Sequence, residues 1–532
     1  MSQLYERARS DSIKPTSRLR SELEHILELK RQSLDEARPD AVEKQHSQGK
    51  LTARERIQAL FDPGTFVEFG ILGHHQNETP LMEGIHGPGD GVVVGIGLCD
   101  GRPVCCASYD FTVLGGSMGT VNDAKMARVR KLALEYGYPL VFFTEGGGAR
   151  VQERMGSKAT KGHDRFFDLA LMSGWVPIIA AVVGPAYAGH ANLAGIADYV
   201  PMLESASMGM AGPKLIEAAT GEIVTKEELG GAEVHCRITG MADARFPNEQ
   251  ELIASIKRFL SFFPSNASQL PPVKEYISEG DERLPDDVLD LLPDAPYRPY
   301  NMWKLVEWIA DPGSLFPLKP EFAQNLITTL ARIGGYPIGI IANNPAYKAG
   351  VLDTPSSDKM AHFISLCDAF NIPLLFLVDV PGYLVGKDAE RSGIVRHSMK
   401  PIYELGQATV PKFTVLIRKA YGLAYHAMCA AEFQPEIIVA WPTAEVSPMG
   451  PEGAVNVVYK EKLADHPELR AQLVEELRAL SGPLKPAQEI RIDDVIDPRD
   501  TRKVILDALR FSFGQTRYSR ARPPKKHGIN PV

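Results

Sequence analysis

The chain has 532 residues, of which 44% are hydrophobic and 23% are charged, and its formal net charge at pH 7 is -8. This length and composition are typical of a globular protein with two or three domains, because a single hydrophobic core rarely grows beyond about 300 residues. The negative net charge gives no electrostatic reason to expect nucleic acid or an anionic membrane surface as a partner.

The sequence predicts neither a targeting segment nor a membrane span. The first 26 residues mix acids and bases and lack an apolar run, so we expect no secretory or transit peptide. No run approaches the roughly 18 apolar residues of a membrane helix. The six cysteines form no CxxC pair and lie mostly within apolar runs, which indicates reduced core residues in a cytoplasmic protein.

A charged helix is predicted over residues 17–37, where leucines recur at helical spacing. After it, the chain repeats itself. Gly335 lies 234 residues after Gly101 (335 − 101), and the same offset aligns many further identities without a gap. These are Pro103 with Pro337, Lys125-Met126-Ala127 with Lys359-Met360-Ala361, Pro139 with Pro373, Gly148 with Gly382, and Ala186-Tyr187 with Ala420-Tyr421. So many identities at one offset predict an internal duplication.

Each copy has the same predicted order of elements. An apolar strand (residues 91–98 and 338–343) precedes a polar turn and a helix that begins near the Lys-Met-Ala triplet. A strand over 139–145 or 373–379 then leads into a glycine turn. A further helix and a third strand, over 176–184 or 410–418, end at a second turn of small residues. Buried strands alternating with helices predict an α/β fold.

A segment rich in proline and acidic residues separates the two copies and has no sustained apolar period. We predict a first domain over residues 1–272, a linker over 273–300, and a second domain over 301–532.

The turns that follow the predicted strands are candidates for chemistry. Where a strand stops at glycine and a helix begins, unpaired backbone N–H groups point outward and can stabilise negative charge. Two such turns that converge form an oxyanion hole without any side chain. An ordinary strand-to-helix turn is the alternative interpretation of each turn taken alone. The candidates in the first copy are Gly146, Gly147, Gly148 and Ala149, followed by Ala188 and Gly189; those in the second are Pro381-Gly382 and Gly422-Leu423.

The glycine turns do not match the common glycine-rich motifs of nucleotide-binding proteins and hydrolases. The first turn lacks the Gly-Lys-Ser/Thr ending of a P-loop, and the glycines near Gly115 lack the Rossmann spacing. No GxSxG elbow occurs, although a Ser-His-Asp triad is not excluded by spacing. The histidines show no HExxH or similar pattern, so no metal site is predicted.

The residues resemble the carboxyltransferase, or beta, subunits of biotin-dependent acyl-CoA carboxylases such as propionyl-CoA carboxylase. The resemblance covers nearly the whole chain. Its motifs are GKLTARERIQALFDPGTFVE, GGARVQE, ATGEIVTKEELGGAEVH, CDAFNIPLLFLVDVPGYLVG and AWPTAEVSPMGPEGAV. The resemblance implies two tandem domains of the crotonase-like (ClpP/crotonase) α/β fold.

The resemblance also implies the reaction. CO2 would pass from carboxybiotin, on a separate carrier protein, to the alpha carbon of an acyl-CoA through an enolate held in an oxyanion hole. By analogy, Gly148, Ala149, Ala188 and Gly189 would serve the acyl-CoA oxyanion. Gly382, Gly422 and Leu423 would serve biotin. The predicted substrate-binding residues are Gly146, Gly147, Arg150, His190, Ala424 and His426.

The family builds its shared site between the first domain of one subunit and the second domain of another, so the resemblance implies a homo-oligomer, a hexamer by analogy. The chain contains no Met-Lys-Met biotin acceptor and no ATP-grasp-like loop, so it needs a partner with biotin carboxylase and biotin carrier functions. No metal is expected in this subunit.

Some positions differ from the common family pattern. Many relatives carry Gly-Gly in both second turns, where this chain has Ala188-Gly189 and Gly422-Leu423. His426 occupies a position that tunes acyl size in relatives. Two alternatives stand beside acyl-CoA carboxylation. One is the carboxyltransferase subunit of a biotin-dependent acyl-CoA decarboxylase, since the resemblance implies that the same fold serves both reactions. The other, which Leu423 and His426 motivate, is a catalytically impaired scaffold paralogue.

Overall fold

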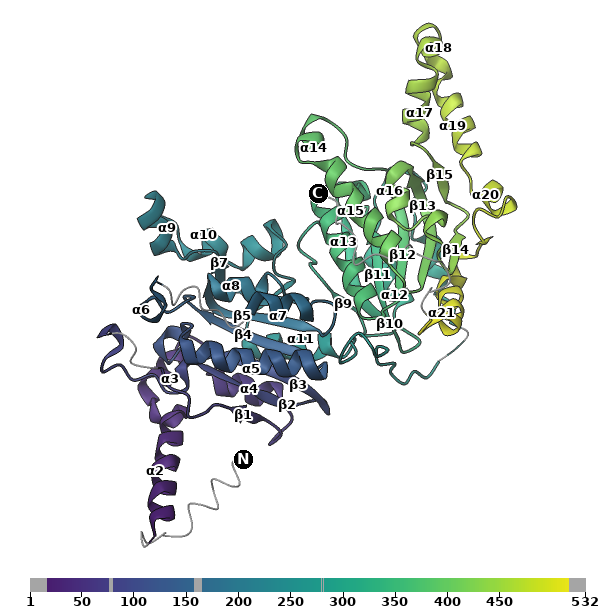
Figure 1. Cartoon of the computed structure of the whole chain (residues 1–532). Coiled ribbons are helices and arrows are strands. Elements are labelled where there is room, and N and C mark those ends of the chain that lie inside the picture. Colours follow the sequence, from purple (N-terminus) through teal and green to yellow (C-terminus); the bar gives the residue numbers. More distant parts are fainter. Residues whose placement is uncertain (1–16, 76–79, 157–164, 279, 281, 516–532) are drawn as a thin grey trace. The chain divides into compact units, whose positions relative to one another are not determined.

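The computed structural model describes residues 17–75, 80–156, 165–278, 280 and 282–515. The chain divides into two compact units, residues 1–268 and 269–532, and each is built around one mixed sheet (Figure 1). In the described part of the chain, no helix is both long and apolar enough to span a bilayer. All six cysteines are buried and none of them forms a disulfide, as the sequence predicts.

The sheet of the first unit has the strand order β1-β2-β3-β4-β5-β6-β8, and β7 pairs with β5 beyond the end of β6. Its strands are β1 (Val67–Phe69), β2 (Val92–Cys99), β3 (Arg102–Tyr109), β4 (Leu140–Gly146), β5 (Ile178–Tyr187), β6 (Pro201–Leu203), β7 (Ser207–Gly209) and β8 (Ala244–Phe246). The hairpin β2–β3 is antiparallel, whereas β3 through β6 and β8 run parallel.

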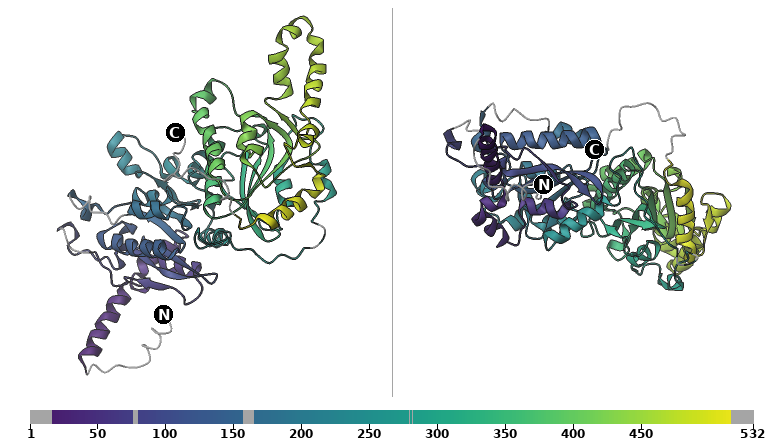
Figure 2. Two further views of the ribbon diagram at one scale, coloured as in Figure 1. Left: turned by 45° about the vertical axis from the view of Figure 1, so that its right-hand side comes forward. Right: turned by 90° about the horizontal axis from the view of Figure 1, so that it is seen from below.

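Two layers of helices cover this sheet. Helices α5 (Thr120–Tyr136) and α7 (Arg165–Met172) pack together on one face, and α4 (Ala53–Leu60) and α11 (Glu249–Leu260) pack together on the other (Figure 2). The remaining helices of the unit are α2 (Arg18–Gln32), α3 (Pro39–His46), α6 (Val151–Arg154), α8 (Gly189–Ala194), α9 (Pro213–Thr220) and α10 (Lys226–Gly230). No residue of α2, the first part of the predicted 17–37 helix, is buried within the chain.

The second unit repeats this plan with the order β9-β10-β11-β12-β13-β14-β16, and β15 pairs with β13. Its strands are β9 (Phe316–Pro317), β10 (Leu326–Ile333), β11 (Tyr336–Asn343), β12 (Leu374–Val380), β13 (Lys412–Tyr421), β14 (Ile437–Ala440), β15 (Glu445–Ser447) and β16 (Asp494–Val495). Both bounds of β13 lie 234 residues beyond those of β5 (412 − 178, 421 − 187), so the duplication extends to the strand ends.

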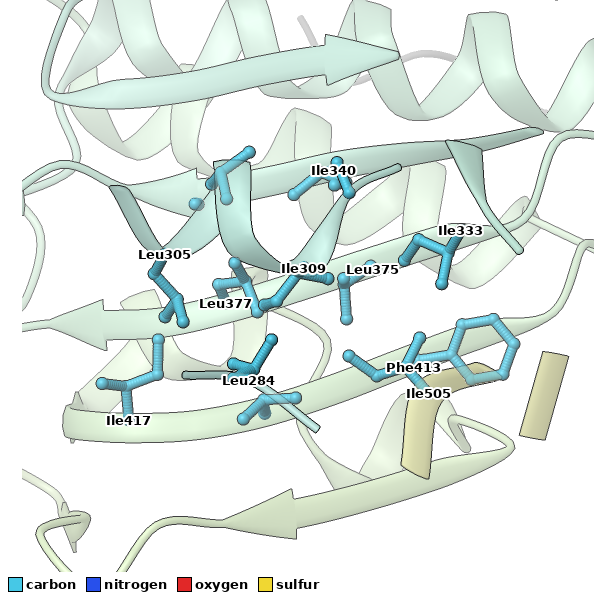
Figure 3. Packing of buried hydrophobic residues seen from close by; sticks show 14 of the residues in the cluster. Leu284, Leu305, Ile309, Ile333, Ile340, Leu375, Leu377, Phe413, Ile417 and Ile505 are labelled. Carbon is cyan, nitrogen blue, oxygen red and sulfur yellow. The ribbon is translucent and has the colours of Figure 1, made fainter. Parts of the chain in front are cut away.

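Helices α13 (Thr354–Ala369) and α15 (Ile394–Gln407) pack together beside the second sheet. On its other face, alternate residues of β11, β12 and β13 meet α12 (Met302–Ile309) and α21 (Thr501–Ser512) in one apolar core (Figure 3). Side chains alternate between the two faces of a strand, so a strand that is apolar throughout can pack against the helices on both faces of the sheet. The other helices are α14 (Lys387–Arg391), α16 (Gly422–Ala427), α17 (Pro451–Val458), α18 (Lys460–Asp465), α19 (Arg470–Leu480) and α20 (Leu484–Gln488).

The structure corrects three details of the predicted order. Each copy has an antiparallel hairpin before its first long helix, so the segments 91–98 and 338–343 are not equivalent strands: the first lies in β2 and the second in β11, the counterpart of β3. Helices α5 and α13 begin five residues before the Lys-Met-Ala triplets. Within the predicted linker 273–300, Leu284 and Val288 join the core of the second unit.

A buried acidic residue is the last but one of the central strand in each unit, β4 and β12. Glu145 is fully buried, and its carboxylate lies 2.5 Å from Lys50 Nζ and 3.0 Å from Arg56 Nη2. Arg56 also pairs with Glu249 at 2.6 Å, so the cluster joins β4 to helices α4 and α11. In the second unit, Asp379 occupies the same position (145 + 234).

The buried cluster generates a stability prediction. Removing the carboxylate in Glu145→Ala leaves Lys50 buried without its acidic partner, so we expect the free energy of unfolding to fall by about 3–5 kcal/mol. Urea denaturation measures this change. The control is Glu135→Ala, which removes an exposed partner of Lys131 and should cost less than about 0.5 kcal/mol. Equal losses in both variants would contradict a structural role for the buried carboxylate.

Candidate active site

The two predicted turns of the first unit converge. Strands β4 and β5 are parallel neighbours, so their turns begin at the same edge of the sheet. Gly148 has a φ of +90°, and a Cβ placed on it would lie 2.8 Å from the Cβ of Ala188 and 3.5 Å from the N atom of Gly189. Only glycine fits this position without displacing the second turn, because an added side chain would be both strained and obstructed.

Backbone hydrogen bonds show which groups of the first turn are paired and which amides have no acceptor among the described residues. The N–H of Met118 donates to the carbonyl of Gly148 at 2.8 Å, and the N–H of Arg150 donates to the carbonyl of Met118 at 2.9 Å. Within the described residues, no acceptor is found for the amides of Gly148 and Ala149. These two amides are therefore available to an oxyanion.

In the second turn, the structure separates two residues that were predicted together. The Ala188 N–H donates to the carbonyl of Gly209 at 3.0 Å, so the prediction of Ala188 as an oxyanion donor is wrong for this structure. Helix α8 begins at Gly189, and its first intrahelical bond runs from the Asn192 N–H to the Ala188 carbonyl. The Gly189 amide precedes that bond and has no partner inside the helix.

The second unit reproduces this hydrogen-bond pattern. The Leu352 N–H donates to the carbonyl of Gly382 at 3.1 Å, and the Leu384 N–H donates to that of Leu352 at 2.7 Å. Tyr383 occupies the place of Ala149, and its amide likewise has no acceptor among the described residues. The sequence prediction omitted Tyr383, although applying the 234 offset to Ala149 identifies it.

The second turn of this unit has a different surface. Gly422 has a φ of +57°, and a Cβ there would lie 2.9 Å from the carbonyl oxygen of Pro448. Leu423 is the second residue of helix α16 and is 46% exposed. Ala424 is buried, so its side chain cannot contact a substrate as predicted.

Arg150 is a structural residue and not the predicted substrate contact. Its side chain is 3% exposed. Its Nη1 donates to Asp90 at 2.5 Å and to Glu153 at 2.7 Å, while its Nη2 donates to the Ser117 carbonyl at 2.9 Å. Burial raises the pKa of Asp90, and the neighbouring guanidinium opposes that shift. The ion cluster holds the chain on both sides of the first turn.

His190 also supports the turn from behind and, being fully buried, is not in a position to bind substrate as predicted. Its Nε2 donates to the carbonyl of Gly116 at 3.1 Å, and the ring packs edge-on against Tyr109. A Cβ on Gly146 would lie 2.4 Å from this Nε2, so the ring abuts the first turn. Burial lowers the pKa of His190 to about 3, which keeps the imidazole neutral.

The remaining predicted residues lie nearer the surface. Gly147 is exposed, and a Cβ there would contact nothing within 4 Å. His426 is 43% exposed, and its Nδ1 lies 2.6 Å from Glu432 Oε1. Substrate contact by these two residues stays a prediction. Among the described residues, no group of three or more acidic, histidine or cysteine side chains is arranged to hold a metal ion.

The fold defines a class of enzyme: a tandem crotonase-like protein whose paired turns lie at the ends of parallel strands. The model of the carboxyl transferase domain family matches residues 44–529. The chain belongs to this family, which confirms the fold and the family that the sequence motifs imply.

Individual relatives cover nearly the whole chain. The carboxyltransferase subunit of propionyl-CoA carboxylase from Haloferax mediterranei is 39% identical over 515 residues, 96% of this chain and 99% of that one. The alpha subunit of methylmalonyl-CoA decarboxylase from Propionigenium modestum is 41% identical over 497 residues, 92% of this chain and 95% of that one. The solved hexamer of transcarboxylase 12S, with methylmalonyl-CoA and methylmalonic acid bound, matches with a TM-score of 0.91 at 39% identity and covers 98% and 100% of the two chains.

The contact between the turns predicts unequal tolerance of two adjacent glycines. Gly148→Ala should lower the urea concentration at the unfolding midpoint, with a cost of about 1–3 kcal/mol, because the added methyl overlaps Ala188. Gly147→Ala is the matched control, since its methyl meets open space, and should change the free energy of unfolding by less than about 0.5 kcal/mol. Equal costs would show that the two turns are not in contact.

The buried imidazole predicts a pH dependence of stability. His190 has its pKa lowered from 6.5 to about 3, so below pH 6.5 the unfolded chain binds a proton that the folded chain does not. The contribution of His190 to stability is present above pH 6.5 and is lost as pH falls toward 3, by up to about 1.4 kcal/mol per pH unit.

Urea denaturation between pH 5 and 7 tests this dependence. His190→Gln keeps an N–H donor but cannot titrate, so its stability should fall less steeply with decreasing pH than that of the wild type. If His190→Gln retains the wild-type slope, His190 is not the titrating group.

Proposed function

We propose that this chain is the carboxyltransferase subunit of an acyl-CoA carboxylase, transferring CO2 from carboxybiotin on a carrier protein to the alpha carbon of an acyl-CoA. The observation that carries this proposal is the duplicated turn. Each unit presents backbone amides without acceptors among the described residues, at Gly148 and Ala149 in the first and at Tyr383 in the second. Carboxyl transfer needs two such sites, because negative charge develops on a thioester oxygen and on the ureido oxygen of biotin.

The first unit suits the thioester. The amides of Gly148, Ala149 and Gly189 would stabilise the enolate oxygen of the acyl-CoA. Rigid donors contribute more than mobile ones because they need no reorganisation as charge develops. The buried imidazole of His190 and the ion pairs of Arg150 supply this rigidity from behind the turn.

The second unit suits biotin. A Cβ on Gly382 would contact nothing within 4 Å, so a planar ring system could approach the backbone there. The Tyr383 amide would donate to the ureido oxygen, and the start of α16 at Gly422 and Leu423 would form the second side. Carboxybiotin supplies the CO2 and, once decarboxylated, the nitrogen that accepts the alpha proton.

The partners and assembly form part of the proposal. A separate biotin carboxylase and biotin carrier would load the carboxyl group. The hexameric transcarboxylase 12S supports assembly of this chain as a homo-hexamer. Six buried cysteines without a disulfide support a reducing compartment, and we propose the cytoplasm.

Decarboxylation is the second candidate function. The Propionigenium modestum relative is a methylmalonyl-CoA decarboxylase subunit, at an identity similar to that of the carboxylase relative. Backbone donors stabilise the same enolate in either direction, so the partner subunits decide the direction of net transfer.

A fixation assay tests the proposed function. The purified chain is mixed with its biotin carboxylase and carrier partners, ATP, labelled bicarbonate and a panel of acyl-CoAs. We expect label in at least one carboxylated acyl-CoA. Gly148→Ala should reduce this label by about tenfold or more, because the added methyl would displace Ala188 and with it the neighbouring Gly189 amide, while label on the carrier continues to form. Carboxylated carrier with no label in any acyl-CoA would overturn the proposal.

A further inference from the structure

A charged network joins a helical arm to the second turn of the second unit. The arm comprises residues 451–480, in which α17 and α19 pack side by side around Val455, Leu473 and Val474 (Figure 1). Arg478, near the end of α19, lies 3.2 Å from Glu445 on β15. The hydroxyl of Tyr421, the last residue of β13, donates to the same Glu445 carboxylate.

The segment that Arg478 holds lies directly beside the turn. Strand β15 pairs with the end of β13, where Tyr421 lies opposite Ser447. The carbonyl of Pro448, the next residue, lies 2.9 Å from where a Cβ on Gly422 would be. The Val446 N–H donates to the Ser481 carbonyl at 2.8 Å, so the end of the arm is attached to β15 by a second bond. Movement of β15 would therefore displace the carbonyl that contacts Gly422.

The first unit shows that the fold does not require this network. Tyr187 corresponds to Tyr421 (187 + 234), and Ser207 pairs with β5 at the register where Glu445 pairs with β13. There, the Tyr187 hydroxyl lies 2.9 Å from the Ser207 hydroxyl, a neutral pair with no link to an arginine in the described structure. The second copy has replaced a neutral contact by a charged one that reaches a separate pair of helices.

The link between the arm and β15 depends on the positive charge of Arg478. One guanidinium faces three carboxylates, with Glu452 at 2.6 Å and Glu475 at 2.5 Å in addition to Glu445. Without it, the nearly buried Glu445 carboxylate would be repelled by its neighbours. Burial raises the pKa of Tyr421, so its hydroxyl stays protonated and continues to donate.

We propose that Arg478 and Glu445 are positioning residues for carboxyl transfer, which hold the biotin-side turn at Gly422 and Leu423 through Tyr421 and β15. They act through the backbone and touch neither substrate. This inference rests on the proposed function, because it assigns that turn to biotin.

The test uses the full-length chain and the transfer of a labelled carboxyl group from a carboxylated acyl-CoA to free biotin. The bond to the alpha carbon breaks, an N–C bond forms at the ureido nitrogen, and the proton of that nitrogen passes to the alpha carbon. We expect Arg478→Ala to raise the KM for biotin by about tenfold, because a small displacement of a binding turn is costly even when the altered residue lies outside the site. The KM for the acyl-CoA should change by less than about twofold. Arg478→Lys keeps the positive charge, so its KM for biotin should lie close to the wild-type value.

Two matched controls separate positioning from general damage. Arg470→Ala removes another arginine of α19, whose hydrogen bonds to Asn456 stay within the arm, and should leave both KM values unchanged. Tyr421→Phe should raise the KM for biotin, whereas Tyr187→Phe, the equivalent change in the first unit, should not.

Three outcomes would overturn this inference while leaving the proposed function standing. They are an unchanged KM for biotin in Arg478→Ala, equal rises in both KM values, and a KM for biotin in Arg478→Lys that is as high as in Arg478→Ala. If the folded wild-type chain transfers no carboxyl group to biotin from any acyl-CoA, the proposed function fails and the inference fails with it.

Discussion

The arrangement of both candidate sites depends on a carboxylate that is buried near the end of each central strand, β4 and β12. Glu145 directly precedes the glycine turn of the first unit, and Asp379 lies two residues before Pro381-Gly382 in the second. A charge in this position requires cationic partners, because an unpaired buried carboxylate costs several kcal/mol. Lys50 and Arg56 meet Glu145, and Arg418 meets Asp379 at 3.0 Å. These ion pairs fix where each strand ends and therefore where each turn begins.

The duplicated backbone carries side chains that have diverged. The bonds from Met118 to Gly148 and from Leu352 to Gly382 are equivalent in the two units. Around them, the first unit uses the buried Arg150 ion cluster, whereas its counterpart in the second is the half-exposed Leu384. Two sites with the same donors can in this way recognise different carbonyl compounds, since the donors come from the backbone and the surroundings come from side chains.

Backbone donors also explain how relatives with different net reactions share this fold. A carboxylase subunit, a decarboxylase subunit and the transcarboxylase 12S each match nearly the whole chain at about 40% identity. An oxyanion hole stabilises an enolate whichever way the carboxyl group moves. A side-chain change at such a turn alters its surface but keeps its backbone amide.

The sequence by itself determined the duplication, the α/β class, the family and the position of every turn, because repeated identities and apolar runs are local signals. It could not decide which amides are free or which side chains reach the surface. Ala188 donates to Gly209, Arg150 and His190 are buried behind the turn, and the partners of Glu145 lie about ninety residues or more away along the chain. Hydrogen-bond partners and burial depend on elements distant in sequence, so only the tertiary structure decided them.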